Sequence, residues 1–356
     1  KEHNRKEEKN MIKPKKLKKG DMVAIVSLSS GTAGDEMFKH RYEQGKKRIE
    51  EVFGLKTITM PNALKGSEYL TKHPEARAND LMDALKDENI KGIICNIGGA
   101  DTIRLLPYID FDVIKNNPKI FMGYSDTTVN HFMMYKAGVT SYYGPCVMCQ
   151  FAENYEMHNY TKKYIEEVLF DNKKDITITS SPEWTSEFLD WSNEEYDSQK
   201  RKMSLEEHGY EIIQGAGSFE GELLGGCLDV FPMFVGTSIW PQKEEWKNKI
   251  LFLETSEDEV SPDYVEYYLR NLIAQGIIDE INGILIGKPQ NETYYNEYKE
   301  VYKRLICEEA GRPDLPILYN VNIGHTDPMC ILPLGQKIKV DLNKKEINFI
   351  GTPMSN

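Results

Sequence analysis

Lys119-Ile-Phe-Met-Gly-Tyr-Ser-Asp-Thr-Thr128 is an apolar run that ends in a polar corner. It predicts a strand that passes through Gly123 to a tight turn at Ser125, followed at once by a helix with apolar residues at helical spacing. Gly138 supplies the helix stop. A sharp strand-to-helix corner projects a serine hydroxyl away from the backbone, beside N–H groups that favour an oxyanion. Ser125 is therefore a candidate nucleophile, although this stretch alone fits an ordinary N-cap serine better.

The sequence before this stretch alternates short apolar runs with amphipathic ones. Strands are predicted at 22–28, 55–59 and 92–97, with one helix ending near Phe53 and another over 74–86. Strands that alternate with helices form right-handed crossovers and a parallel sheet, and ligands bind at the carboxyl ends of its strands. The sequence therefore predicts an α/β fold with this edge as the binding edge.

Two loops share that edge of the predicted sheet. Gly98-Gly99 follows one strand and Ser125 follows the next. A glycine N–H from the first loop can face the serine of the second, because glycine lets the backbone approach a substrate closely. By itself the glycine pair fits a plain strand-to-helix turn better than an oxyanion hole.

The second half of the chain has strand and helix patterns of its own. They predict a second α/β unit, beyond a polar segment at 181–214. Its expected strands are 219–224, 249–253, 283–287, 317–321 and 336–341, and its expected helices are 228–235 and 262–276. We expect a disordered extension at 1–10, an N-terminal domain with the nucleophile at 11–170, a linker and aromatic loop at 171–214, and a C-terminal domain at 215–356.

Composition and charge exclude several classes of protein. The chain has 356 residues and a formal net charge of -12, which argues against nucleic acid or an anionic membrane as partner. The sequence has no apolar run long enough to span a bilayer and no signal segment, so we expect the protein in the cytoplasm.

Cys146-Val-Met-Cys149 lacks a second ligand pair at a zinc-site interval, and we interpret the two cysteines as packing residues. No metal and no cofactor are expected.

Of the seven histidines, five lie in the tail or in polar, surface-like contexts, and two remain as candidates. His131 is on the helix after Ser125, about two turns up, where its ring would face away from the nucleophile. His325 follows a strand and stands next to the flexible Gly324. A serine needs a base that touches its hydroxyl, and that base needs a carboxylate to orient it. The arrangement that we expect combines Ser125, His325 and Glu254.

The polar segment carries aromatic residues among many charges. An exposed tryptophan is costly unless it packs on something, and a flat ring or nucleobase is a natural partner. Trp184 and Trp191 could therefore bind a ligand, or they could anchor the loop to the body of the protein. The sequence leaves these alternatives equal.

Taken together, these segments resemble the LD-carboxypeptidase family of serine peptidases, which includes the microcin C immunity peptidases. The matching pieces are Asn96-Ile-Gly-Gly-Ala-Asp-Thr102, Leu105-Leu-Pro-Tyr-Ile-Asp110, Gly123-Tyr-Ser-Asp-Thr-Thr128, Gly225-Gly226, Leu253-Glu254, Gly287-Lys-Pro-Gln290 and Gly324-His-Thr-Asp327. The resemblance implies a flavodoxin-like parallel-sheet N-terminal domain and a smaller β-rich α/β C-terminal domain, with the active site between them. It also implies a homodimer.

The resemblance assigns roles to individual residues. Ser125 would be the nucleophile, His325 the base and Glu254 the orienting acid, with the backbone N–H groups of Gly99 and Asp126 as the oxyanion hole. The residues expected to contact the substrate are Trp191, Trp184, Gly98 and Lys288. Cys227 departs from the polar residue that relatives often carry after the Gly-Gly pair.

Two branches of the family differ in substrate. One removes a terminal D-alanine from cell-wall tetrapeptides, and the other hydrolyses an aminoacyl link to a nucleotide-like group. The segment Glu183-Trp-Thr-Ser-Glu-Phe-Leu-Asp-Trp191 is similar to the longer aromatic loop of the second branch. The resemblance therefore favours the second branch, that of the microcin C immunity peptidases, with an aminoacyl-nucleotide or small peptide as substrate. Cleavage of murein tetrapeptides is the alternative. A non-catalytic small-molecule binding protein is a third hypothesis, although that class usually carries an export signal.

Overall fold

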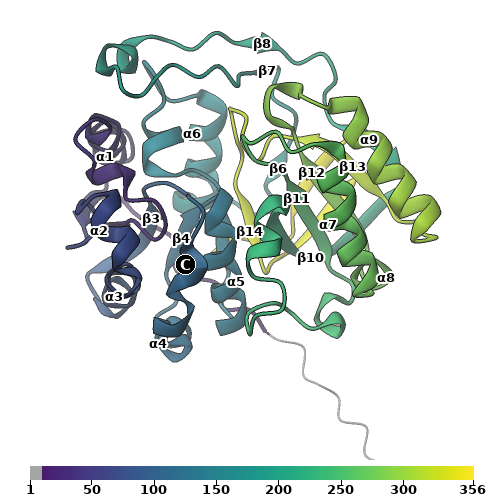
Figure 1. Cartoon of the computed structure of the whole chain (residues 1–356), viewed down its shortest axis with the longest axis horizontal. Coiled ribbons are helices and arrows are strands. Elements are labelled where there is room, and N and C mark those ends of the chain that lie inside the picture. The colour runs from purple at the N-terminus through teal and green to yellow at the C-terminus, as the bar shows by residue number, and fades with distance from the viewer. Residues whose placement is uncertain (1–9) are drawn as a thin grey trace, which may run out of the picture.

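The computed structural model describes residues 10–356, which form two large sheets with helices packed around them and a small two-stranded sheet (Figure 1). The strands are β1 (Met22–Val26), β2 (Lys56–Thr59), β3 (Ile90–Cys95), β4 (Ile120–Gly123), β5 (Ser141–Tyr143), β6 (Thr177–Ile178), β7 (Glu183–Trp184), β8 (Ser204–Leu205), β9 (Glu211–Gln214), β10 (Ser218–Cys227), β11 (Ile250–Glu254), β12 (Gly283–Gly287), β13 (Ile317–Val321), β14 (Leu332–Leu334), β15 (Lys337–Asp341) and β16 (Glu346–Phe349). The α-helices are α1 (Lys39–Phe53), α2 (Ser67–Lys72), α3 (Pro74–Lys86), α4 (Phe111–Asn116), α5 (Thr128–Ala137), α6 (Asn159–Ile165), α7 (Pro262–Ala274), α8 (Ile277–Glu280) and α9 (Tyr295–Lys303).

The first sheet has the strand order β14-β5-β4-β3-β1-β2. Strands β1 to β5 pair in parallel, and their order of 2-1-3-4-5 is the flavodoxin-like one. The central strands β3 and β4 are buried on both faces except at Lys91, as their mostly apolar sequences require. The predicted flavodoxin-like sheet is therefore confirmed, with β14 added antiparallel at its edge by a distant part of the chain.

The second sheet is mixed, in the order β6-β16-β15-β10-β11-β12-β13-β9. Its long strand β10 pairs antiparallel with β15 along its first half and parallel with β11 along its second half. Strands β11, β12 and β13 continue in parallel, so their carboxyl ends share one edge. The predicted β-rich α/β architecture of this half is confirmed.

Several segments differ from the expected elements. The predicted helix at 228–235 is the short 3-10 helix η7 (Leu228–Met233), which contains Pro232, a residue that cannot donate a backbone hydrogen bond. The polar segment at 181–214 contains β7, β8 and β9, and β9 joins the second sheet. Because β6 also joins the second sheet while β14 joins the first, the chain crosses between the sheets more than once. The domain boundaries stay a prediction.

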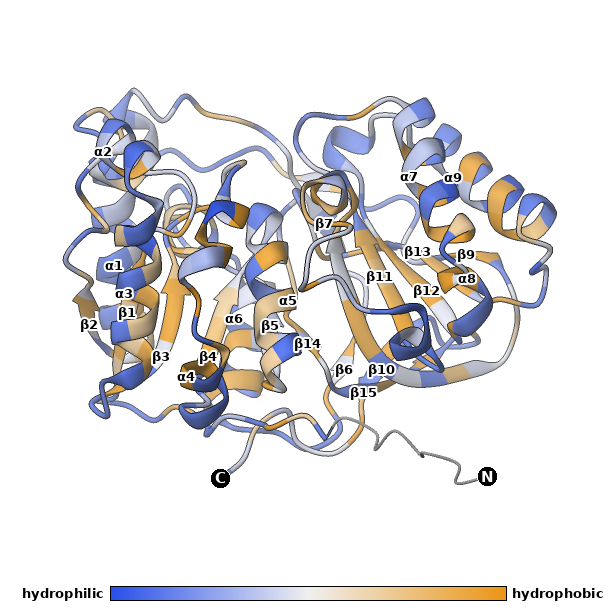
Figure 2. Ribbon diagram, turned by 60° about the horizontal axis from the view of Figure 1, so that its bottom comes forward, coloured by the Kyte–Doolittle hydropathy of each residue, from blue (hydrophilic) through white to orange (hydrophobic). Residues whose placement is uncertain are grey.

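Burial follows hydropathy in both halves. Figure 2 shows apolar strands enclosed by helices whose outer faces are hydrophilic. One buried cluster extends across both sheets and includes Tyr143 of β5 and Phe252 of β11, whose ring centroids lie 5.0 Å apart. Within residues 10–356, no helix has the length and apolar character needed to cross a membrane. The cytoplasmic location and the homodimer stay predictions, and the expected extension at 1–10 lies, except for Asn10, outside the described residues.

Gly225 in β10 is a position where the packing of two strands requires glycine. It has φ 152°, and a Cβ built there would lie 1.9 Å from the carbonyl oxygen of Phe252 in β11. We expect Gly225→Ala to lower the free energy of unfolding by about 1–3 kcal/mol more than Gly217→Ala does. The control Gly217 also has positive φ, 77°, but has no atom within 4 Å of the added Cβ. Urea denaturation measures both, and equal losses would contradict the clash.

Candidate active site

Ser125 lies at a strained corner between β4 and the 3-10 helix η3 (Ser125–Thr127). Its φ of 67° is positive, which is uncommon for a residue other than glycine and is found where surrounding structure enforces it. The N-cap of η3 is Tyr124, whose side chain makes no capping hydrogen bond. Ser125 is thus the first residue of the helix rather than its cap, and its hydroxyl is available to another partner.

That partner is His325, from the loop after β13. Its Nε2 atom lies 3.1 Å from the Ser125 Oγ atom, and its Nδ1 atom lies 2.7 Å from the Glu254 Oε2 atom. Glu254 ends β11 and its side chain is 0% exposed, so the carboxylate depends on protein partners to replace water. The three residues that the sequence analysis combined therefore meet, one from the first sheet and two from the second.

Tyr143 joins two members of this chain of hydrogen bonds. Its hydroxyl donates to the Glu254 Oε1 atom at 2.6 Å and accepts from the backbone N–H of Ser125 at 3.0 Å. The residue is fully buried, and burial raises its pKa well above the usual value, so the phenol keeps its proton. Sequence reasoning missed Tyr143, because nothing in its local sequence signals a contact with a residue more than a hundred positions away.

A second carboxylate also reaches the histidine. The Glu257 Oε2 atom lies 3.0 Å from the His325 Nε2 atom. Burial lowers the pKa of His325, but the charges and hydrogen bonds of Glu254 and Glu257 outweigh burial and raise that pKa well above its usual value. The hydrogen bond with His325 lowers the pKa of Glu257 to about 2. Sequence reasoning missed Glu257, whose only signal is its position in the acidic turn after Glu254.

The Gly98-Gly99 loop lies against the Ser125 corner. A Cβ built on Gly98 would be 3.4 Å from both the Ser125 Oγ atom and the Asp126 backbone nitrogen. Asp126 is fully buried, and its carboxylate accepts from the Ser29 hydroxyl at 2.7 Å and from the Thr102 N–H at 2.9 Å. These bonds join three loops at the carboxyl edge of the first sheet, as the parallel topology predicts.

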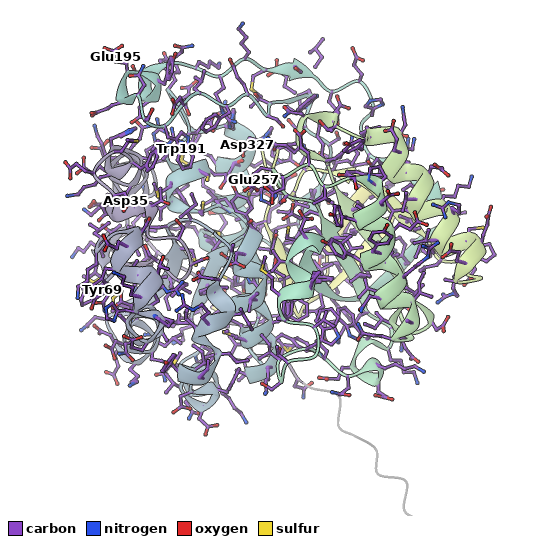
Figure 3. All side chains as sticks on the ribbon, in the orientation of Figure 1. Asp35, Tyr69, Trp191, Glu195, Glu257 and Asp327 are labelled. Atoms are coloured by element: carbon purple, nitrogen blue, oxygen red, sulfur yellow. The ribbon has the colours of Figure 1, made fainter. Side chains whose placement is uncertain are left out.

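A pocket of about 400 Å³ opens above Ser125. Its walls include His325 and Glu257 from the second half, and Phe188 and Trp191 from the segment that carries β7 and β8. In Figure 1 this segment crosses the top of the molecule from the side of α1 to the side of α9. Figure 3 labels Trp191, Glu257 and Asp327, which all line the pocket. The Arg41 guanidinium packs 4.6 Å from the centre of the Trp191 ring.

Arg201 holds the same segment to the pocket. Its guanidinium is 2.6 Å from the Glu153 Oε2 atom and 2.7 Å from the Asp327 Oδ2 atom. Burial would raise the pKa of Glu153, but His158 and Arg201 outweigh burial and lower that pKa to about 2. The positive charge of Arg201 is therefore shared between two carboxylates of the pocket wall.

Two expected substrate contacts lie outside the lining of this pocket. The Lys288 side chain is 0% exposed, is 3.2 Å from the Glu206 Oε2 atom, and lies 4.2 Å from the centre of the Trp184 ring. Trp184 packs on Lys288, as expected for the alternative in which the tryptophan anchors the loop, and the contact of these two residues with a substrate stays a prediction. Gly98 and Trp191 do line the pocket.

The other residues considered in the sequence analysis are His131, Cys146 and Cys149. His131 is fully buried, its ring contacts the Gly123 carbonyl oxygen, and burial lowers its pKa to about 4. Cys146 and Cys149 are free thiols in the pocket wall. Within residues 10–356, no group of three or more His, Cys, Asp and Glu side chains is arranged to hold a metal ion.

We expect Glu254→Gln to lower the pKa of His325, because an ion pair that favours the protonated ring is lost while burial still disfavours it. A titration of the His325 ring by NMR measures this pKa. Glu259→Gln is the control, since Glu259 bonds to Asn291 instead. An unchanged His325 pKa in Glu254→Gln would contradict the ion pair.

Comparisons with known proteins show the family of this chain. Family models match residues 23–144, as the LD-carboxypeptidase N-terminal domain, and residues 220–340, as the LD-carboxypeptidase C-terminal domain. The crystal structure of an MccF-like protein from Streptococcus pneumoniae in complex with AMP superposes with a TM-score of 0.85 and 36% identity, covering 93% of this chain and 98% of that one.

Further relatives extend the match. The microcin C7 self-immunity protein MccF of Escherichia coli is 27% identical over 93% of both chains. A structure of MccF in complex with glutamyl sulfamoyl guanosine has a TM-score of 0.82 at 25% identity, covering 97% of this chain and 100% of that one. A Bacillus subtilis protein described as a probable murein peptide carboxypeptidase is 27% identical over 94% of this chain and 92% of its own length. The chain belongs to the LD-carboxypeptidase family.

Proposed function

We propose that this protein is a serine hydrolase that cleaves the amide-type bond between an aminoacyl group and a nucleotide-like group. The observation that carries the proposal is the Ser125–His325–Glu254 chain of hydrogen bonds at the base of a pocket that Trp191 also lines. The ligands of two relatives, AMP and glutamyl sulfamoyl guanosine, support a nucleotide in this pocket.

In the first step, the Ser125 Oγ atom bonds to the carbonyl carbon of the aminoacyl group. Its proton passes to the Nε2 atom of His325, while Glu254 holds the Nδ1–H and stabilises the imidazolium. The carbonyl oxygen becomes an oxyanion, which the N–H groups of Gly99 and Asp126 stabilise. The carbon–nitrogen bond then breaks, and the leaving nitrogen takes the proton from Nε2.

The second step releases the aminoacyl group. His325 removes a proton from water, the resulting hydroxide attacks the ester carbonyl, and the Ser125 oxygen leaves with the proton that Nε2 returns. The products are a free amino acid and the nucleotide-like amine. Because the strained corner fixes Ser125 before any substrate arrives, little rearrangement is needed at the moment of reaction.

A murein LD-carboxypeptidase that releases D-alanine is the second candidate, favoured by the relative from Bacillus subtilis. The same three residues would perform that reaction. The segment with Phe188 and Trp191 separates the two candidates, because a peptide has no base to stack on an indole. The third hypothesis, a non-catalytic binding protein, gives no reason for a strained serine that faces a histidine–carboxylate pair.

We expect Ser125→Ala to lower kcat on alanyl-sulfamoyl adenosine by about four orders of magnitude or more, because the nucleophile is lost. Chromatographic detection of sulfamoyl adenosine measures the reaction. Ser198→Ala, at an exposed turn of η6 (Glu194–Ser198), should retain wild-type rates. Turnover that survives in Ser125→Ala would exclude the serine mechanism.

We expect Trp191→Leu to raise KM for the nucleotide substrate about ten- to a hundredfold, since stacking on a base contributes about 1–3 kcal/mol. The same variant should leave cleavage of a tetrapeptide ending in L-lysyl-D-alanine unchanged, if the wild type cleaves it at all. Trp184→Leu is the matched control, because Trp184 packs on Lys288 outside the pocket lining. An equal rise in KM in both variants would show that Trp191 acts through the fold of the loop.

A further inference from the structure

The Nε2 atom of His325 faces two partners at nearly the same distance. Ser125 Oγ is 3.1 Å away and Glu257 Oε2 is 3.0 Å away. When Nδ1–H points to Glu254, a neutral ring presents a lone pair at Nε2, and a carboxylate oxygen repels a lone pair. The contact with Glu257 is therefore attractive only while Nε2 carries a proton. In that state His325 cannot accept the proton of Ser125.

Glu257 differs from the other carboxylates of the pocket wall. Glu153 and Asp327 both pair with Arg201. Within residues 10–356, the one cationic partner of Glu257 is His325, and the Glu257 side chain is 64% exposed although it lines the pocket. A carboxylate in this position is free to turn towards a cation that enters the pocket.

The chemistry of the substrate provides such a cation. A carbonyl carbon attacked by Ser125 carries its α-nitrogen only two bonds away, and in an aminoacyl-nucleotide this nitrogen is a free ammonium. Glu257 and Ser125 contact the same histidine nitrogen, so a group attached next to that carbonyl lies within reach of Glu257. A basic side chain of the aminoacyl group would carry the same positive charge at a greater distance from the carbonyl carbon.

We propose that Glu257 is the binding subsite for an ammonium group on the acyl part of the substrate, and that this contact frees His325 to act as the base. The inference rests on the proposed function for the position of the acyl group. When Glu257 turns to the substrate ammonium, the imidazolium loses one of its two carboxylate partners and releases its Nε2 proton to solvent water. Substrate binding and activation of the base are then the same event.

Two pairs of substrates test the subsite. The first pair is alanyl-sulfamoyl adenosine with its α-amino group free or acetylated. The second pair carries an acetylated α-amino group in both members and compares a lysyl with a norleucyl side chain. The wild type should show a kcat/KM about ten- to a hundredfold higher for the ammonium-bearing member of at least one pair, as expected for a charge-assisted hydrogen bond. The pair in which this preference appears shows whether Glu257 binds the α-ammonium group or an ammonium on the side chain.

In Glu257→Gln this preference should fall to about threefold or less, because a neutral amide lacks the charge. Asp258→Asn is the matched control, since it removes an exposed carboxylate from the adjacent position and should keep the wild-type preference. A wild type without preference in either pair would overturn the inference, and so would a Glu257→Gln variant that retains it.

The pH profile separates this role from a merely structural one. His325 is faced by Glu254 at the end of β11, by Glu257, by the Tyr124 ring and by the charge of Asp229 in η7. Removing the Glu257 charge lowers the pKa of His325, so the acidic limb of kcat/KM for the acetylated substrate should move to lower pH in Glu257→Gln. The limb should stay in place in Asp258→Asn. An unshifted limb in Glu257→Gln would contradict the resting ion pair.

An error in the proposed function can be told apart from an error in the subsite. A wild type that cleaves none of the nucleotides would show that the proposed function is wrong. The subsite is then tested on a tetrapeptide ending in L-lysyl-D-alanine, with the lysine amine free or acetylated. Loss of the preference for the free amine in Glu257→Gln would support the subsite without the nucleotide, and an undiminished preference would overturn it.

Discussion

The buried carboxylate of Glu254 takes its hydrogen-bond partners from both large sheets of the structure. A carboxylate at the end of an interior strand must be satisfied by protein partners, because the cost of an unpaired buried charge is several kcal/mol. Tyr143 comes from the first sheet and His325 from the loop after β13 of the second. Both sheets must therefore be in place before Glu254 is satisfied, and once it is, the relative position of Ser125 and His325 is fixed as well.

The rest of the site is held by similar bonds between distant segments. Asp126 joins the Ser125 corner to the loops that carry Ser29 and Thr102, and Arg201 joins the aromatic segment to Glu153 and Asp327. Each of these side chains is polar and mostly buried, so its bonds are costly to break. The dipoles around Ser125 are thus oriented before a substrate binds, which is the arrangement that stabilises a developing charge most effectively.

Local sequence pattern was enough to predict the strands and helices that carry the site. The strand before Ser125, the helix end at Gly138 and the helix over 74–86 follow from apolar spacing and stop signals, and the structure has them. What pattern could not supply was contact between distant side chains. Tyr143 and Glu257 reach the candidate site through tertiary packing alone. Nor does local pattern indicate that Trp184 and Glu206 enclose Lys288, whose expected contact with a substrate stays a prediction.

The crossing of β14 back to the first sheet bears on how the protein is made. A ribosome releases the first sheet long before Leu332–Leu334, so during synthesis strand β5 stays an open edge with unpaired backbone groups. The nascent N-terminal half therefore carries a site for wrong pairing with another chain until the late strand covers it. Strand β5 also carries Tyr143, the hydrogen-bond donor to Glu254. A product that ends before β14 would therefore leave open the edge of the strand that supports this carboxylate.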